Sequence, residues 1–582
     1  MSERLEFGRF VLEPSLQRLT RNGKVIPLKP KAYDLLCQLL AHRDRVVSKA
    51  ELLDWLWPRQ EISESNLSQT VYELRRAIED GSGEARCIET VPRRGYRFVG
   101  QVASPARSAT SEVPASLAVL PFLELGDGAE QAHFGLGIAD ALITALAGLG
   151  GLVVRPLSAI MRYAEGRQDA LEAGRRLQVD AILEGSFQAG ATGIRISTRL
   201  LRVADGTCLW ADQFTSADRD PFAVEDAVSS RAAEAFAGEL AGDAASPRAS
   251  RRTDDPEVHI ASMKGWYCWH KWSIPAWMQA IRHFQHALEL QPDHAPSLAG
   301  LAATWSTLGI FGASPPREAF DNAREAAAKA VALAPDYSRG HEIMGAIHLF
   351  HDWDFSAAAH CLDRAIELDP DSCNARHLRA LTLAAGERNA PALAEINRAL
   401  QADPQSLITL TDVGYIHYWG RRYAEAEKTC RDVLALAPDF AHARQALAYV
   451  LVELNNPDQA LTELRRAVKQ AGIEPDLSGD LAWLLGRMGQ KTEAEAIISA
   501  LESQSSRDYV DPYQLVLAYI GLGDHVHAFE ALKRALHNRS RDLMLMRVDP
   551  VMDPIRSDAR YEPFLEEAGL ASKRVAHSPD GS

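Results

Sequence analysis

The sequence of 582 residues predicts a multidomain protein, with an α+β domain first, a small α/β domain second and a long all-α solenoid third. Two stretches rich in Ser, Ala, Pro and Gly, near 104–114 and 242–256, lack apolar periodicity and are typical of linkers. Beyond the second stretch, small residues recur every 34 positions, and the chain is too long for one hydrophobic core. We therefore divide the chain into 3–101, a linker at 102–115, 116–242, a linker at 243–256, 257–540 and a C-terminal cap at 541–572.

Composition and charge exclude several classes of protein. Seven cysteines are scattered without a CxxC pair, which argues against a disulfide framework and against a zinc site. The N-terminus carries no apolar run, and the longest weakly polar stretch, 141–154, is shorter than the ~20 residues of a membrane span. We expect a cytoplasmic protein with no membrane contact. Within the net charge of −15, residues 1–101 hold 17 Lys and Arg against 14 Asp and Glu, whereas 102–242 hold 11 against 18 and 243–582 hold 35 against 46.

The first segment combines strands, three helices and a hairpin. LEFGRFVLEP and QRLTRNGKVIPL alternate apolar and polar residues and predict a small antiparallel sheet. Helices follow at 29–42, at 48–58, where Ser48 and Glu51 form a capping box, and at about 65–79. TVPRRGYRFVG at 90–100 reads as a hairpin. This order is that of a winged helix, whose third helix buries a stripe at Leu67, Val71, Leu74 and Ile78.

The side chains of this segment that could contact a ligand lie on the outward face of the third helix and on the hairpin. The helix presents long polar side chains that are able to hydrogen-bond to base edges: Ser65, Gln69, Tyr72, Glu73 and Arg76. The hairpin carries three arginines, with no carboxylate among residues 90–100: Arg93, Arg94 and Arg97. A solvated turn would also explain them, but together with the helix they favour contact with phosphate.

The segment as a whole resembles the OmpR/PhoB-type effector domain. The matching pieces are LKPKAYDLL, ELLDWLW, NLSQTVYELRRAI and IETVPRRGYRFVG. The resemblance implies that the third helix enters the major groove of double-stranded DNA and that the hairpin is a wing that reaches the adjacent minor groove or backbone. It implies that Gln69, Tyr72, Glu73 and Arg76 read bases and that Ser65 and Ser68 also contact the DNA. Arg75, Arg93 and Arg94 are expected to contact phosphates, Trp57 is expected to contact the DNA backbone, and Arg97 is the expected wing arginine. Tyr96 and Phe98 are expected to pack the wing onto the domain.

The middle segment predicts a compact α/β domain. SLAVLPF reads as a buried strand, and three later stretches alternate as antiparallel strands with glycine turns. AVLPF, DAILEGSF and LWADQF resemble the TolB amino-terminal-like domain, which implies a fold and no catalytic role. The glycines in FGLGIAD and LAGLGG do not form a nucleotide-binding loop. We find no catalytic constellation and predict that the chain is not an enzyme and needs no cofactor or metal.

The third segment repeats with a period of 34 residues. Alanines stand at 358, 392, 426, 460, 494 and 528, a second column of small residues at 346, 380, 414, 448 and 482, and prolines at 370, 404 and 438. Small residues suit helices that cross closely, and proline ends a helix. The pattern is the signature of tetratricopeptide repeats, about eight of them, with the first two less regular. Their concave face is a predicted site for an unknown protein or peptide.

Two histidine pairs in the repeats need an interpretation. His348 and His351 stand beside Asp352, and His525 stands near His527. Because neither group has a suitably spaced third ligand, we interpret them as exposed histidines at helix ends.

The sequence thus predicts a sequence-specific DNA-binding transcription regulator. No receiver domain precedes the winged helix, which starts at residue 3, so we expect a one-component type whose later domains sense a protein or a ligand. Members of the resembled family often bind promoter direct repeats as tandem pairs, which implies a dimer on DNA. The alternative is an interaction scaffold whose winged helix binds protein instead of DNA, because residues 1–101 are only weakly basic.

Overall fold

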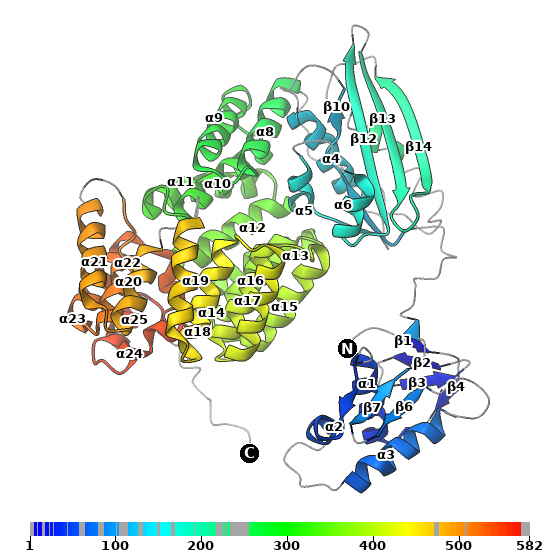
Figure 1. Ribbon diagram of the computed structural model, residues 1–582. Coiled ribbons are helices and arrows are strands. Elements are labelled where there is room, and N and C mark those ends of the chain that lie inside the picture. The colour runs from blue at the N-terminus through cyan, green and yellow to red at the C-terminus, as the bar shows by residue number, and fades with distance from the viewer. Residues whose placement is uncertain are drawn as a thin grey trace, which may run out of the picture. The chain divides into compact units, whose positions relative to one another are not determined.

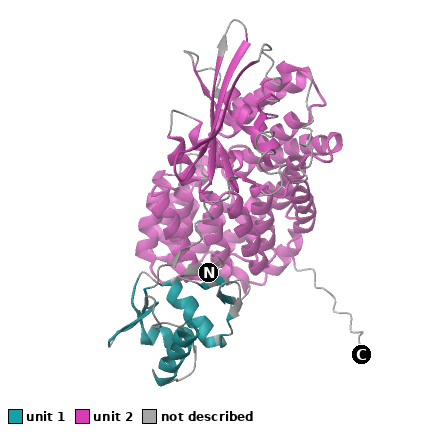
Figure 2. Cartoon of the chain, turned by 90° about the vertical axis from the view of Figure 1, so that its right-hand side faces the viewer, with its two compact units in different colours: residues 1–112 teal, residues 113–582 magenta. Residues whose placement is uncertain are grey.

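The computed structural model describes residues 5–7, 10–13, 18–21, 24–26, 28–42, 45–56, 64–78, 87–92, 94–99, 102–103, 114–125, 132–147, 152–164, 169–190, 193–216, 224, 227–229, 231–232, 255–470, 477–505, 507 and 509–571. The chain forms two compact units, residues 1–112 and 113–582, shown in different colours in Figure 2. Each unit has its own hydrophobic core.

The first unit opens with the expected antiparallel sheet. Its strand order is β4-β3-β2-β1-β8, from β1 (Leu5–Phe7), β2 (Phe10–Glu13), β3 (Arg18–Arg21), β4 (Lys24–Ile26) and β8 (Val102–Ala103). Three helices follow, α1 (Pro30–Ala41), α2 (Lys49–Leu56) and α3 (Glu64–Ala77), and the strands β5 (Val47–Ser48), β6 (Ile88–Val91) and β7 (Gly95–Phe98) form a second sheet in the order β5-β7-β6. The predicted winged-helix order is confirmed (Figure 1).

Local sequence signals explain how this unit is held together. The capping box is present, since Ser48 Oγ accepts from the Glu51 N–H at 3.2 Å and the Ser48 N–H donates to Glu51 Oε2 at 2.9 Å. The hydrogen bonds that the Glu51 carboxylate accepts from the Ser48 N–H and from the Ser48 hydroxyl lower the pKa of Glu51 to about 2. Gly95 is required where β7 meets β5, because a Cβ there would lie 1.9 Å from the Val47 carbonyl oxygen. The predicted stripe of α3 is buried at Leu67, Val71, Leu74 and Ile78.

The middle domain is built on a mixed sheet. Its strand order is β11-β9-β12-β13-β14, with β10 also paired to β12, and the strands are β9 (Ser116–Val119), β10 (Leu123–Glu124), β11 (Val153–Val154), β12 (Ala181–Gly190), β13 (Gly193–Arg202) and β14 (Cys208–Ser216). β9 pairs in parallel with both β11 and β12, and β10 pairs in parallel with β12, while β12, β13 and β14 form a long antiparallel meander. The helices are α4 (Ala132–Ala147), α5 (Leu157–Ile160) and α6 (Ala170–Arg176). Most of the helix expected after 220 lies outside the described residues.

Helices in antiparallel pairs make up the array that follows. Within 255–538 the described residues form eight consecutive pairs (Figure 1): α8 (Pro256–Trp269) with α9 (Ile274–Leu290), α10 (Ala295–Ile310) with α11 (Pro316–Leu333), α12 (Ser338–Ile347) with α13 (Phe355–Leu368), α14 (Cys373–Ala385) with α15 (Asn389–Ala402), α16 (Leu407–Trp419) with α17 (Tyr423–Leu436), α18 (Ala441–Glu453) with α19 (Pro457–Gln470), α20 (Ser478–Arg487) with α21 (Lys491–Ser505), and α22 (Tyr513–Leu522) with α23 (His525–Asn538). The six alanines of the first column are all 0% exposed, which explains why no larger residue stands there.

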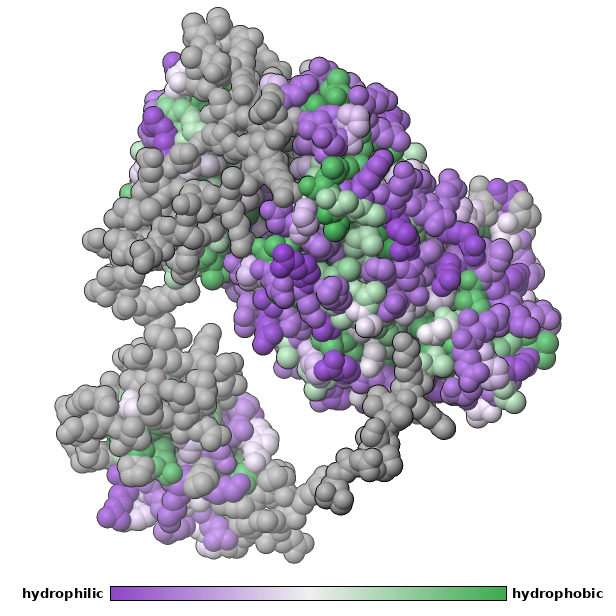
Figure 3. All heavy atoms as spheres, turned by 180° about the vertical axis from the view of Figure 1, so that it is seen from behind, coloured by the Kyte–Doolittle hydropathy of each residue, from purple (hydrophilic) through white to green (hydrophobic). Residues whose placement is uncertain are grey.

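The turns inside the pairs repeat as strictly as the alanines. From the third pair to the eighth, the residue that reverses the chain has a positive φ, and these residues stand 34 apart: Trp353, Glu387, Arg421, Asn455, Gly489 and Gly523. A π-helical turn, His348–Asp352, lengthens α12 before the first of them. The surface of 113–582 that Figure 3 presents is mostly hydrophilic with smaller apolar patches, as expected for helices that bury one face.

The C-terminal piece of the chain packs into the array. It forms short helices at η5 (Arg541–Leu545), η6 (Pro550–Met552), α24 (Asp553–Arg556) and α25 (Tyr561–Glu567). Leu543, Met546, Val551, Met552 and Ile555 are fully buried and belong to the same hydrophobic cluster as the repeat helices.

Within the second unit, one buried arginine joins the middle domain to the array. Arg155 is 5% exposed. Its guanidinium donates to the carbonyl oxygens of Leu177 at 3.0 Å and Gln178 at 2.9 Å, at the end of α6. It also donates to those of Gln401 at 2.8 Å and Ala402 at 3.0 Å, at the end of α15. The C-terminal carbonyls of a helix lack intrahelical partners and carry partial negative charge, so one cation serves two helix ends.

Candidate nucleic-acid interface

The outward face of α3 presents a row of polar side chains above its buried stripe. Ser65, Ser68, Gln69 and Arg76 are exposed, and Tyr72 is 60% exposed although it is a large aromatic residue. Their spacing places them along one side of the helix, since the opposite positions pack into the core. The structure therefore brings these five predicted residues together on one accessible surface.

Glu73 is half-buried and lies between two partners. Lys29 Nζ donates to Glu73 Oε1 at 2.7 Å, and Gln69 Nε2 donates to the same oxygen at 3.5 Å. The hydrogen bond from Lys29 lowers the pKa of the Glu73 carboxyl below its usual value. The ion pair with Lys29 offsets the negative charge of Glu73 on this face of the helix.

Arg75 points to the hairpin. Its Nη2 donates to the Ile88 carbonyl oxygen at 2.9 Å and to Thr90 Oγ1 at 2.8 Å. Both acceptors belong to β6, so Arg75 ties α3 to the hairpin. The phosphate contact expected of Arg75 stays a prediction. Such a contact would have to form alongside the two hydrogen bonds to β6, or replace them.

The wing presents Arg94 and Arg97 on either side of the Gly95 position. Arg94 is exposed at the turn, where its backbone N–H donates to the Val91 carbonyl oxygen at 3.1 Å. Arg97 is half-exposed, and its Nη2 lies 2.8 Å from Glu89 Oε2 on the neighbouring strand. Tyr96 and Phe98 are buried, which confirms that they pack the wing onto the domain.

Two predicted site residues, Trp57 and Arg93, lie outside the described residues. Sequence reasoning missed Lys29 and Glu89, which hold Glu73 and Arg97. No local pattern signals the first, because it pairs across 44 positions. Glu89 stands opposite Arg97 in the hairpin register, and that cross-strand position was a usable signal.

The histidine cluster of the array differs from expectation. His351 is 7% exposed, so the interpretation of His348 and His351 as exposed helix-end residues is wrong. Their Nδ1 atoms lie 2.8 Å and 3.1 Å from the two carboxylate oxygens of Asp352, which Arg324 also pairs. The π-helical turn brings these side chains inward. Among the residues that the structure describes, no cluster of His, Cys, Asp or Glu is arranged to hold a metal ion.

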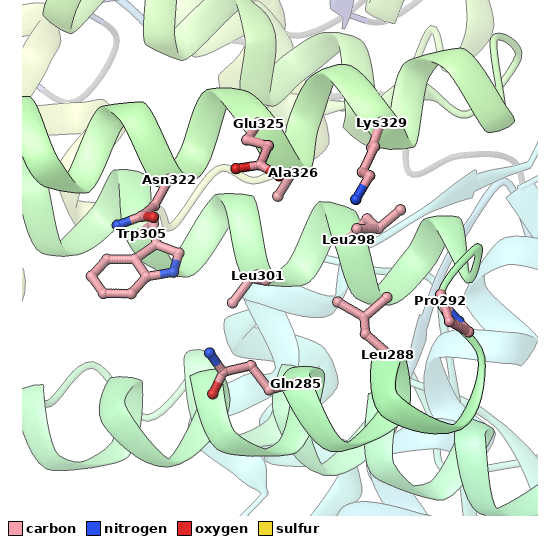
Figure 4. Close-up of a pocket in the computed structure, with 10 residues that line it drawn as sticks. All are labelled: Gln285, Leu288, Pro292, Leu298, Leu301, Trp305, Asn322, Glu325, Ala326 and Lys329. Atoms are coloured by element: carbon pink, nitrogen blue, oxygen red, sulfur yellow. The ribbon is translucent and has the colours of Figure 1, made fainter.

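A cavity of about 320 Å³ lies between α9, α10 and α11. In Figure 4 the amino group of Lys329 and the amide of Gln285 point into it from opposite sides. The remaining lining is mostly apolar: Leu288, Pro292, Leu298, Leu301, Trp305 and Ala326, with Asn322 and Glu325 at the margin. This combination suits a small amphipathic ligand.

Comparison with known families agrees with these three parts. Residues 23–98 match the family described as transcriptional regulatory protein, C terminal. Residues 113–231 match the HilA/YgeH-like transcriptional regulator, second domain, and residues 421–472 match the tetratricopeptide repeat. The likeness of the middle domain to the TolB amino-terminal domain stays a prediction.

Individual relatives cover different shares of the chain. The transcriptional regulator HilA of Salmonella typhi is 23% identical over 404 residues, which is 69% of this chain and 71% of that protein. The transcriptional activator CadC of Escherichia coli is 33% identical over 93 residues, 16% of this chain and 18% of that protein. A putative adenylate cyclase 3 of Rhizobium meliloti is 30% identical over 187 residues, 32% of each chain, and that partial match does not carry its activity here.

No helix in the described part of the chain is long and apolar enough to cross a membrane. The exposed row on α3, the arginine-bearing wing and the matching families lead to one conclusion. The chain is a DNA-binding transcription regulator that joins an OmpR/PhoB-type winged-helix domain to a HilA/YgeH-like second domain and a tetratricopeptide-repeat array.

Proposed function

We propose that the chain recognises specific promoter sequences by placing α3 in the major groove while the wing grips the neighbouring backbone. The observation that carries the proposal is the exposed row on α3, rigidly backed by the domain core. Helix side chains of this length reach base edges, and bidentate amide or guanidinium contacts discriminate between bases. Arginine on a wing adds affinity without reading sequence.

The residues divide into three roles. Gln69, Tyr72 and Arg76 read bases, with Ser65 and Ser68 beside them, and Arg94, Arg97, Arg93 and Trp57 contact the backbone. Glu73 acts mainly through Gln69, which it orients. Arg75 acts mainly through β6, because its hydrogen bonds to Ile88 and Thr90 fix the angle between helix and wing.

Selection of genomic DNA fragments at two salt concentrations tests the proposal. We expect the full chain to enrich a recurring short motif, arranged as a spaced direct repeat if two copies bind side by side. If DNA is retained without enrichment of a motif and the retention disappears at higher salt, the binding is non-specific binding to phosphates. Absence of retention at both salt concentrations would favour the interaction scaffold instead.

Three variants separate the roles. Arg97→Ala should weaken binding to all sequences and lower the salt slope by about 1. Gln69→Ala and Arg76→Ala should instead relax the preference at single base pairs, by ~1–3 kcal/mol at the best site. Arg199→Ala is the matched control, because Arg199 pairs with Glu184 at 2.7 Å much as Arg97 pairs with Glu89, but it lies in the middle domain. If the three variants bind like this control, the site assignment fails.

The second unit receives the signal in this proposal. The chain acts without enzymatic activity of its own, and a protein or small ligand binds the middle domain or the array. The cavity between α9, α10 and α11 is the candidate small-ligand site. Ligand-dependent thermal stabilisation of the full chain, lost on Trp305→Ala, would identify such a ligand, and an unchanged response would exclude this cavity.

A further inference from the structure

Three side chains near the C-terminus contact three successive turns of the array. Arg539 lies over the Trp353 ring, with its guanidinium carbon 4.8 Å from the ring centroid. Arg547 pairs with Glu387. Asp553 accepts from both terminal nitrogens of Arg421, each at 2.7 Å. The three array residues belong to the 34-residue ladder of positive-φ turns, in the third, fourth and fifth pairs.

The two ion pairs among these contacts have opposite polarity, which favours one register of the segment. Arg547 brings a positive charge to a glutamate, whereas Asp553 brings a negative charge to an arginine. A shift by one repeat would place Arg547 against Arg421, so charge repulsion disfavours the wrong register. Charges of opposite sign at fixed intervals along a groove favour one register of an extended ligand.

Apolar burial accompanies the polar ladder. Between Arg539 and Leu570 the segment contributes side chains that are at most 8% exposed: Leu543, Met544, Met546, Val548, Val551, Met552, Ile555, Tyr561, Phe564, Leu565, Ala568 and Leu570. They join one cluster with the first helices of the later pairs. Those helices are buried along continuous runs, 446–452 in α18 and 513–518 in α22. A helix buried on every side has neighbours on every side, so the inner face is covered here.

We propose that residues 539–570 are the resident ligand of the array, an intramolecular clasp that leaves the eighth pair, contacts the turns of the third, fourth and fifth pairs in that order and closes the inner face. The clasp is covalently attached, so its effective concentration is of millimolar order and exceeds that of any dilute outside peptide. A protein partner then binds the outer face, or the first two pairs, which the three contacts do not reach. The predicted terminal cap therefore acts well beyond the last helix pair.

Hydrogen–deuterium exchange on the full chain tests the clasp. Arg421→Asp places two carboxylates together and should speed exchange of amides in 541–570 about threefold to tenfold, with faster exchange at the inner ends of α16 and α18. Arg421→Asp combined with Asp553→Arg should restore the slow exchange. Arg465→Asp is the control, because Arg465 pairs with Glu493 at 2.9 Å with similar exposure but lies on α19.

Two results would overturn the proposal. One is an exchange rate in 541–570 that responds to Arg421→Asp no more than to Arg465→Asp. The other comes from a labelled synthetic peptide of residues 539–571 added to the unaltered chain. A closed face predicts no binding to the unaltered chain, so tight binding there would mean that the inner face is open. A second peptide that carries Asp553→Arg should bind measurably to the Arg421→Asp variant, because it restores the ion pair that the resident segment has lost. The peptide measurement stands if the charge swap fails to restore exchange through local misfolding.

Discussion

Replacing Arg155 should weaken the attachment of the middle domain to the array. Its guanidinium makes four hydrogen bonds to carbonyl oxygens at the ends of α6 and α15. Charge-assisted hydrogen bonds contribute about 1.5–3 kcal/mol each, and bonds that share one group do not add fully. For Arg155→Ala we therefore expect a loss of about 3–5 kcal/mol from the free energy that holds the two parts together.

Calorimetry and hydrogen exchange on the full chain measure this loss. The unaltered second unit should unfold with its middle domain and array coupled, whereas Arg155→Ala should give an earlier, separate transition for the middle domain and faster exchange in α6. Arg155→Lys should recover little, because a compact ammonium cannot span both helix ends. Arg199→Ala, which breaks an exposed ion pair worth about 0–1 kcal/mol, is the control. If Arg155→Ala behaves like Arg199→Ala, one cation shared by two helix ends does not couple the domains.

Three further outcomes are expected. Arg75→Met should lower the melting temperature of the winged helix by removing about 1–2 kcal/mol of hydrogen bonding, while Arg76→Met should leave the melting temperature unchanged and alter only DNA preference; equal melting temperatures would contradict the anchoring role. Gly95→Ala should disrupt the pairing of β5 with β7, seen as faster amide exchange in both strands, because the added methyl meets a backbone oxygen. The hydrogen bond to Asp352 raises the pKa of His348 to about 9. The stabilisation of the folded chain by protonated His348 should therefore be complete below pH 6.5 and disappear as the pH rises through 9. A His348→Gln variant whose melting temperature differs from that of the unaltered chain by the same amount at pH 6 and at pH 10 would refute this.

The parts that were predictable from sequence depend on short-range order. The stripe from Leu67 to Ile78 follows from the helical period, and the alanine column from Ala358 to Ala528 follows from repetition, since each residue meets the same neighbours in every unit. The outward face of α3 is then fixed by geometry, and so is the hairpin around Gly95.

Contacts between distant residues account for what was missed. Glu73 and Lys29 are 44 positions apart, and Arg155 and Ala402 are 247 apart. No periodicity connects such pairs, because they arise only when finished elements dock against each other. The same applies to Arg421 and Asp553, whose pairing shows that the C-terminal piece reaches the middle of the array.

The six positive-φ turns that recur every 34 residues combine local backbone strain with contacts to distant residues. For residues with a side chain, this conformation costs roughly 1 kcal/mol, which glycine does not incur. Gly489 and Gly523 stand at the turns where an added side chain would touch nothing within 4 Å. Trp353, Glu387 and Arg421, in contrast, stand where the C-terminal segment makes contact. At Trp353, Glu387 and Arg421 a contact with the C-terminal segment therefore offsets the local cost, whereas Asn455, at the next turn, is of a residue type that adopts this conformation more readily than most.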